Sequence, residues 1–96
     1  MIKNKVTVVG LGYVGLPLLC CIAKNRHFIV CGFDLDKEKI SKIQRKICPI
    51  DDANTAKYLK KVSLKVSSEP KILEGSEFII ICVPTPVKNN KIPDLK

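Results

Sequence analysis

Apolar residues along this chain fall into short runs separated by polar residues, and the spacing within each run predicts a strand or a helix. Lys5–Val9 is rich in β-branched residues, which is typical of a strand. Apolar residues then recur at helical spacing from Leu16 to Ala23, and His27–Phe33 is a second apolar run of strand length. The chain therefore opens with a predicted strand, helix and strand.

The next segment has a helical period and its own boundary signals. Asp36 is a candidate N-cap for a helix that runs to about Ile47, where Cys48 and Pro49 are expected to end it. We expect the isoleucines at 40, 43 and 47 to form the buried face of this helix, with the charged residues on the opposite, solvated face.

Weaker patterns follow, and then one strong pattern. We expect a short helix within residues 50–62, a minor strand within 63–68 and a one- or two-turn helix closed by Gly75. Glu77–Val83 is a continuous apolar run, which is typical of a strand covered on both faces, and residues 84–96 resemble a loop. Alternating strands and helices predict an α/β fold with a parallel sheet and right-handed crossovers.

Composition restricts the class of protein. At 96 residues, with 46% hydrophobic and 27% charged residues, the chain is at most one small globular domain. No apolar run is long enough to cross a bilayer and the start lacks the layout of a signal peptide, so we expect a cytoplasmic protein without a membrane partner. The five cysteines are an odd number without a C-x-x-C spacing, and four of them stand in apolar surroundings. We therefore expect no disulfide framework and no metal site.

The net charge of +8 raises the alternative of a nucleic-acid binder. However, the basic residues are spread from Lys3 to Lys96 and only five aromatic residues accompany them. Solvated helix surface is the better interpretation, so we expect no nucleic-acid partner. Salt-dependent retention on DNA would test the alternative.

Three glycines between the first strand and helix carry the main chemical signal. Gly10, Gly12 and Gly15 fit the pattern G-x-G-x-x-G. In such a turn the first glycine permits the tight bend, the second lets a pyrophosphate approach the backbone, and the third lets the helix pack on the strand. Phosphates would then lie on the free N–H groups at the helix N-terminus.

An acidic residue at the expected distance strengthens this interpretation. Asp34 lies at the end of the second strand, 19 residues after Gly15, where its carboxylate can accept hydrogen bonds from an adenosine ribose. A simple helix-start role is the alternative, but Asp36 fills that role better. Because a carboxylate repels a 2′-phosphate, Asp34 favours NAD over NADP. The glycine pattern and the acidic residue together predict a Rossmann-type sheet.

Longer strings are more specific than the glycines. "VVGLGYVGLPLL", then "CGFDLD", then "IIICVPTP" and "PDL" closely resemble the N-terminal NAD-binding domain of the UDP-glucose/GDP-mannose dehydrogenase family. Enzymes of this family oxidise the C6 alcohol of a nucleotide sugar to a carboxylate with two NAD. The chain looks more like the UDP-N-acetylhexosamine branch than the UDP-glucose branch.

The resemblance also implies roles for individual residues. Asp34 would hold the adenosine ribose, and Lys39 would reach the adenosine end of the cofactor, although an exposed lysine without a role is equally consistent. Tyr13 would contact the cofactor mostly through its backbone. The remaining cofactor-binding residues would lie in the glycine turn around the pyrophosphate or at the end of the last strand and in the loop after it. They are Gly10, Leu11, Gly12, Val14, Gly15, Val83, Pro84 and Thr85.

The chain stops inside the family's "PDL" motif, so residues 1–96 would form the N-terminal portion of an incomplete dinucleotide-binding domain. None of the five cysteines matches the family's nucleophile, so we expect no catalytic residue here and no activity from the chain alone. The nucleotide sugar would bind only to a longer chain, which is expected to be a homo-oligomer. A truncated, non-catalytic NAD-binding module is one alternative. Another Rossmann enzyme, such as a 3-hydroxyacid dehydrogenase, is a second, against which the V-P-T-P and P-D-L strings argue.

Overall fold

The computed structural model describes residues 4–25 and 27–82, and within them strands and helices alternate as the sequence predicts. The elements are β1 (Asn4–Val9), α1 (Gly15–Ala23), β2 (Phe28–Phe33), α2 (Lys37–Gln44), α3 (Ala53–Leu59), β3 (Lys65–Ser67), the 3₁₀ turn η1 (Pro70–Leu73) and β4 (Phe78–Ile81).

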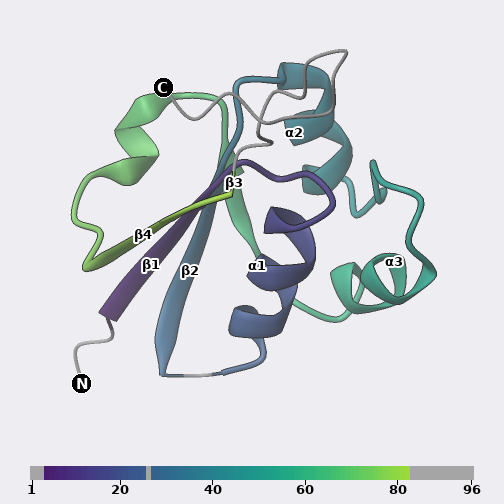
Figure 1. Ribbon diagram of the computed structural model, residues 1–96, viewed down its shortest axis with the longest axis horizontal. Helices are drawn as coiled ribbons and strands as arrows, with labels where there is room; N and C mark the ends of the chain where they lie inside the picture. Colours follow the sequence, from purple (N-terminus) through teal and green to yellow (C-terminus); the bar gives the residue numbers. More distant parts are fainter. Residues whose placement is uncertain (1–3, 26, 83–96) are drawn as a thin grey trace, which may run out of the picture.

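The four described strands form one parallel sheet in the order β3-β2-β1-β4. Because β1 lies between β2 and β4, Val8 is paired with Gly32 on one side and with Ile80 on the other. The three α-helices lie on one side of the sheet and η1 on the other (Figure 1). All four strands therefore end at the same edge, which confirms the predicted α/β class.

The main core lies between the helices and the sheet. Val8 from β1, Leu19 from α1 and Leu59 from α3 are fully buried there. Burial of such side chains contributes roughly 1.5–3 kcal/mol each, so this layer fixes α1 against β1. The remaining buried members are Leu11, Leu16, Cys20, Val30, Ile40, Ile43 and Val66.

Helix α2 ends earlier than the sequence predicts. It stops at Gln44, because Lys46 adopts a left-handed conformation with φ of 65°. The Lys46 N–H donates to Ile43 O and the Ile47 N–H to Lys42 O, which is the hydrogen-bond pattern of a Schellman C-cap. The expected end at Cys48 and Pro49 is therefore wrong, and Ile47 is half-exposed outside the helix instead of on its buried face.

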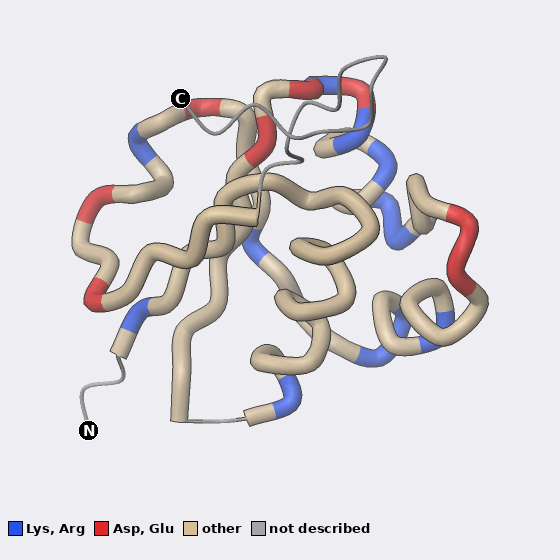
Figure 2. The backbone as a smooth tube through the Cα atoms, viewed as in Figure 1, with Lys and Arg blue, Asp and Glu red and all other residues tan. Residues whose placement is uncertain are grey.

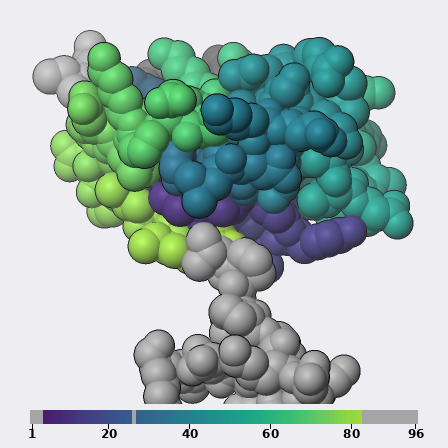
Figure 3. All heavy atoms as spheres, turned by 90° about the horizontal axis from the view of Figure 1, so that it is seen from above, coloured from purple at the N-terminus to yellow at the C-terminus, as the bar shows by residue number. Residues whose placement is uncertain are grey.

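The expected burial of the last strand is also wrong for the described residues. β4 pairs only with β1, and Phe78, Ile79 and Ile81 are 54%, 50% and 68% exposed. A strand is covered on both faces only if elements lie over both, and within residues 4–82 η1 lies mainly against β2 and β3 rather than β4. β4 accordingly forms part of the molecular surface, in yellow-green (Figure 3).

Polar contacts hold the connection between η1 and β4 against β1. The Lys5 ammonium donates to Ile72 O and to Glu74 O, each at 2.7 Å. The hydroxyls of Thr7 and Ser76 are hydrogen-bonded at 2.6 Å. Thr7 is fully buried, so this hydrogen bond satisfies its hydroxyl.

Charge and cysteine placement follow the sequence analysis with one exception. Lys and Arg are distributed along α2 and α3 (Figure 2). All five cysteines are free, but Cys21 is exposed on α1 rather than in apolar surroundings. In the described part of the chain no group of three or more His, Cys, Asp or Glu side chains could hold a metal ion. Nor does any helix there have the length and apolar character needed to cross a membrane.

Candidate cofactor site

The glycine turn leaves the sheet at the carboxyl end of β1 and leads directly into α1. Gly10 has a φ of 95°, a conformation that side chains with a Cβ rarely adopt. Its N–H donates to Phe33 O at 2.8 Å, which ties the start of the turn to the end of β2. Gly10 is therefore required by the backbone bend itself.

The other two glycines have different reasons to be glycine. A Cβ on Gly15 would lie 1.6 Å from the Gly10 carbonyl oxygen, so only glycine lets α1 approach β1 this closely. Among the described residues, a Cβ on Gly12 would have no atom within 4 Å other than those of its chain neighbours. The space beside Gly12 is open, as expected where a ligand and not the protein fills it.

Within the described part of the chain, helix α1 begins without a side-chain cap. Val14 stands at its N-cap position without a side-chain hydrogen bond, and its first turn holds no acidic residue. Asp36 and Asp52, by contrast, cap α2 and α3 through their carboxylates. Among the described residues, the N–H groups of 12–15 find no acceptor. Such a helix start offers unpaired donors and a positive dipole end to an anion.

Asp34 follows β2 immediately and points back to the glycine turn. Its Oδ2 accepts the Leu11 N–H at 2.8 Å, and its Oδ1 accepts the Asp36 N–H at 2.9 Å. Burial alone would raise the pKa of Asp34, but the hydrogen bonds from Leu11, Asp36 and Lys39 together lower that pKa below its usual value. The carboxylate is thus charged and held in place beside the turn.

Lys39 lies in the first turn of α2 and reaches the same carboxylate. Its ammonium is 3.1 Å from Asp34 Oδ2, with the two side chains 25% and 13% exposed. The cap of α2 fixes the lysine backbone, because Asp36 Oδ1 accepts the Lys39 N–H at 3.1 Å. Lys39 therefore forms an ion pair at the predicted site, and its contact with the cofactor stays a prediction.

The residues between the glycines are divided between the core and the surface. The Leu11 side chain is fully buried, so only its backbone borders the site. Tyr13 and Val14 are each 68% exposed, and the Tyr13 hydroxyl accepts the Asp51 N–H at 3.4 Å. The Tyr13 side chain thus reaches the loop that precedes α3.

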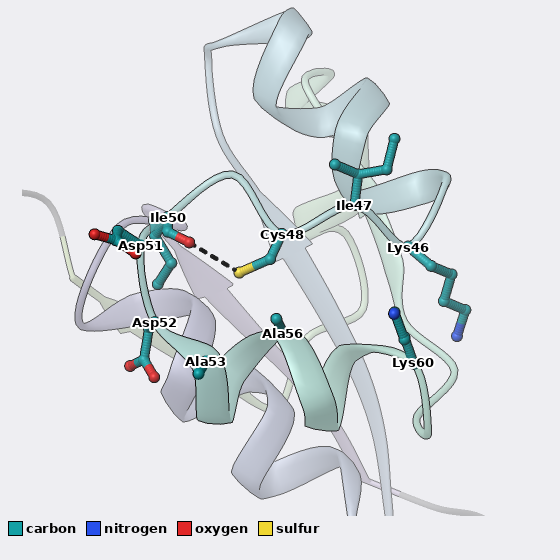
Figure 4. A pocket seen from close by; sticks show the side chains of 9 residues that line it. All are labelled: Lys46, Ile47, Cys48, Ile50, Asp51, Asp52, Ala53, Ala56 and Lys60. Atoms are coloured by element: carbon teal, nitrogen blue, oxygen red, sulfur yellow. Dashed lines mark hydrogen bonds between the residues drawn. The ribbon is translucent and has the colours of Figure 1, made fainter.

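A separate pocket lies behind that loop. It is lined by residues of the α2–α3 connection and of α3, and the Cys48 thiol donates to Ile50 O beside it (Figure 4). None of the predicted cofactor residues lines this pocket. It is therefore separate from the predicted cofactor residues.

The structure brings most of the predicted residues to one edge of the sheet. Gly10, Gly12, Gly15, Asp34 and Lys39 all lie at the carboxyl ends of β1 and β2, where open parallel sheets bind ligands. Val83, Pro84 and Thr85 fall outside the described residues. The hydrogen bond from Leu11 to Asp34 is the feature that sequence analysis missed, because nothing in the spacing indicates that the acid also accepts from the turn.

These observations fit NAD. Donors without acceptors at the start of α1, open space at Gly12 and a fixed carboxylate match a pyrophosphate and an adenosine ribose in order. The fold and the site define a Rossmann-type dinucleotide-binding domain. The model of the "UDP-glucose/GDP-mannose dehydrogenase family, NAD binding domain" matches residues 4–96, and the chain belongs to this family of NAD-dependent oxidoreductases.

Individual relatives agree with this assignment. A UDP-N-acetyl-D-glucosamine 6-dehydrogenase from Salmonella typhi is 38% identical over 92 residues, which cover 95% of this chain and 21% of the relative. The structure of a UDP-D-ManNAc dehydrogenase from Pyrococcus horikoshii matches with a TM-score of 0.84 and 37% identity, over 95% of this chain and 22% of that one. A GDP-mannose dehydrogenase from Pseudomonas aeruginosa matches with a TM-score of 0.82 and 30% identity, over 94% and 22%. The chain thus spans about a fifth of the length of these relatives.

Proposed function

We propose that this chain is the adenosine-binding part of a nucleotide-sugar 6-dehydrogenase that oxidises the C6 alcohol of a UDP-N-acetylhexosamine to a carboxylate with two NAD. The observation that carries the proposal is the glycine turn, in which Gly12 has open space and α1 begins without a cap. The relatives whose names specify a UDP-N-acetylhexosamine support this branch of the family.

The residues of the site have separate roles in this proposal. The N–H groups of 12–15 would hold the pyrophosphate, and Asp34 and Lys39 the adenosine ribose. When bound, NAD accepts the hydride that leaves the substrate carbon. The turn and Asp34 would fix the cofactor so that its reacting end lies in one place, and such positioning can contribute roughly 7–11 kcal/mol to lowering a barrier.

We infer that residues 1–96 alone do not catalyse this reaction. A dinucleotide lies across two halves of a sheet, and the described strands supply the adenosine half only. The exposed apolar surface of β4 supports this inference, because exposed edge strands are usually protected by further structure. We expect the longer protein to be a cytoplasmic homo-oligomer.

The test compares this chain with the protein encoded by its complete reading frame. Both would be incubated with NAD and a panel of UDP-hexoses and UDP-N-acetylhexosamines while NADH absorbance is followed. We expect the longer protein to form two NADH per UDP-N-acetylhexosamine and the 96-residue chain to form none. Gly12→Val in the longer protein is the matched loss-of-cofactor control.

Two results would contradict the proposal. NADH formation by the repurified 96-residue chain would show that the chain is catalytically complete. A longer protein that binds NAD but oxidises no nucleotide sugar would show that the substrate class is wrong. Oxidation of UDP-glucose in preference to the acetylated sugars would overturn the branch alone.

A further inference from the structure

The ion pair at the ribose end of the site places opposite charges where NAD and NADP differ. Asp34 Oδ2 already accepts two hydrogen bonds, from the Leu11 N–H at 2.8 Å and from the Lys39 ammonium at 3.1 Å. Oδ1 accepts one, from the Asp36 N–H at 2.9 Å. The Asp34 carboxylate that would repel a 2′-phosphate is therefore paired with a cation.

The Lys39 ammonium has capacity beyond this pair. An ammonium carries three donors, and one of them is directed to Asp34. The side chain is 25% exposed, against 13% for Asp34, so the cation is the more accessible member of the pair. An anionic group added to the ribose would meet Lys39 as well as Asp34.

Asp36 is a second acidic residue near Lys39, but among the described side chains it forms no ion pair with the Lys39 ammonium. Its Oδ1 accepts the N–H groups of Glu38 and Lys39 at 3.0 and 3.1 Å, so it is committed to capping α2. Among the described side chains, the Lys39 ammonium forms its ion pair with Asp34 and with no second carboxylate. The charge of the lysine is therefore opposed by Asp34 alone at this distance.

We propose that Lys39 is a specificity-determining residue that weakens discrimination against a 2′-phosphorylated cofactor by offsetting the charge of Asp34. The chain still prefers NAD, because the carboxylate is fixed by two backbone N–H groups and the lysine is held by one contact. This inference rests on the proposed placement of the adenosine ribose at Asp34.

Ligands that occupy only the adenosine half suit the 96-residue chain. We would compare ADP with 2′-phospho-ADP, because these two ligands differ only in the phosphate at the 2′ position. Dissociation constants for both would be measured by NMR titration at about 0.15 M ionic strength, where distant charges are screened. The measured quantity is the ratio of the two constants.

Two variants are expected to move this ratio in opposite directions. Lys39→Met removes the cation and should weaken binding of the 2′-phosphorylated ligand relative to ADP by about fivefold. Asp34→Asn removes the carboxylate, leaves the lysine unpaired and should strengthen the relative binding of that ligand. Lys42→Met, one turn further along α2, removes the same charge away from Asp34 and should leave the ratio unchanged.

The following results would overturn the proposed role of Lys39. An unchanged ratio in Lys39→Met, with ADP still bound, would overturn the role of Lys39 and leave the proposed function intact. An equal change in Lys42→Met would show a general charge effect and would also overturn it. ADP binding that survives Gly12→Val, or no ADP binding at all, would reject the placement of the cofactor and this inference together.

Discussion

The Asp34 carboxylate accepts the Leu11 N–H at 2.8 Å, so the residue that follows β2 is tied to the turn that follows β1. This hydrogen bond joins the two parts of the site that are separated by 23 residues in sequence. We therefore expect a change at Asp34 to affect both the proposed ribose contact and the position of the glycine turn.

The glycines give the sharpest pair of variants. We expect Gly12→Val to abolish NAD binding and to leave the domain folded, because within residues 4–82 a Cβ at this position has no atom within 4 Å other than those of its chain neighbours. We expect Gly15→Ala to unfold or strongly destabilise it, because its Cβ would lie 1.6 Å from Gly10 O. Circular dichroism and NMR titration with NAD separate the two effects. Normal NAD binding by Gly12→Val would show that the turn does not hold the pyrophosphate.

Cofactor preference provides a second prediction. We expect NAD to bind more tightly than NADP, because in the proposed site the Asp34 carboxylate would lie beside the 2′ position of the adenosine ribose. Asp34→Ala should narrow the difference. Calorimetric titration of the longer protein with each cofactor measures the difference in affinity. NADP binding equal to or tighter than that of NAD would contradict the prediction.

Acid stability depends on the same carboxylate. Because hydrogen bonds lower its folded-state pKa despite burial, Asp34 contributes stability that is fully present above its unfolded-state pKa of about 3.9 and is lost as pH falls through the lower folded value. We expect Asp34→Asn to be less stable than the wild type at neutral pH, with the difference shrinking below about pH 4. Urea unfolding at several pH values measures this. Asp51→Asn corrects for the loss of one negative charge, and a difference independent of pH would contradict the prediction.

The cysteines should differ in reactivity without serving catalysis. Burial raises the pKa of the Cys20 thiol, with a smaller contribution from Cys48, so we expect Cys20 to react slowly with a thiol reagent. The exposed Cys21 should react first. Peptide mapping after brief alkylation gives the order. In the longer protein Cys82→Ser should keep its turnover, and loss of turnover from this folded variant would show that Cys82 takes part in the reaction.

Local patterns were enough to predict the elements and the glycine turn, because their signals lie within a few residues. Asp36 was found as a cap, and the order of strands and helices agrees with the sequence analysis. The end of α2 was missed because Lys46 takes the left-handed position that usually belongs to glycine. The exposure of β4 was missed because apolar character indicates what a strand can bury and not which elements lie beside it.

The hydrogen bond from Leu11 to Asp34 and the ion pair with Lys39 belong to a third kind of feature. Both depend on how β1, β2 and α2 are arranged in space. No spacing in the sequence indicates that Asp34 Oδ2 accepts hydrogen bonds from both the Leu11 N–H and the Lys39 ammonium. The residues of the site could be named from the sequence, whereas their mutual contacts required the structure.

The single-sided pairing of β4 also determines how its amides exchange with solvent. The Cys82 N–H donates to Val9 O, and donors alternate along a parallel strand, so the N–H groups of Ile79 and Ile81 point to the outer edge. Within residues 4–82 these amides should lose their protons to deuterium early, while those of β1, paired on both sides, exchange last. The most apolar described strand is thus one of the two edge strands of the sheet, and hydropathy is a poor guide to local opening in this fold.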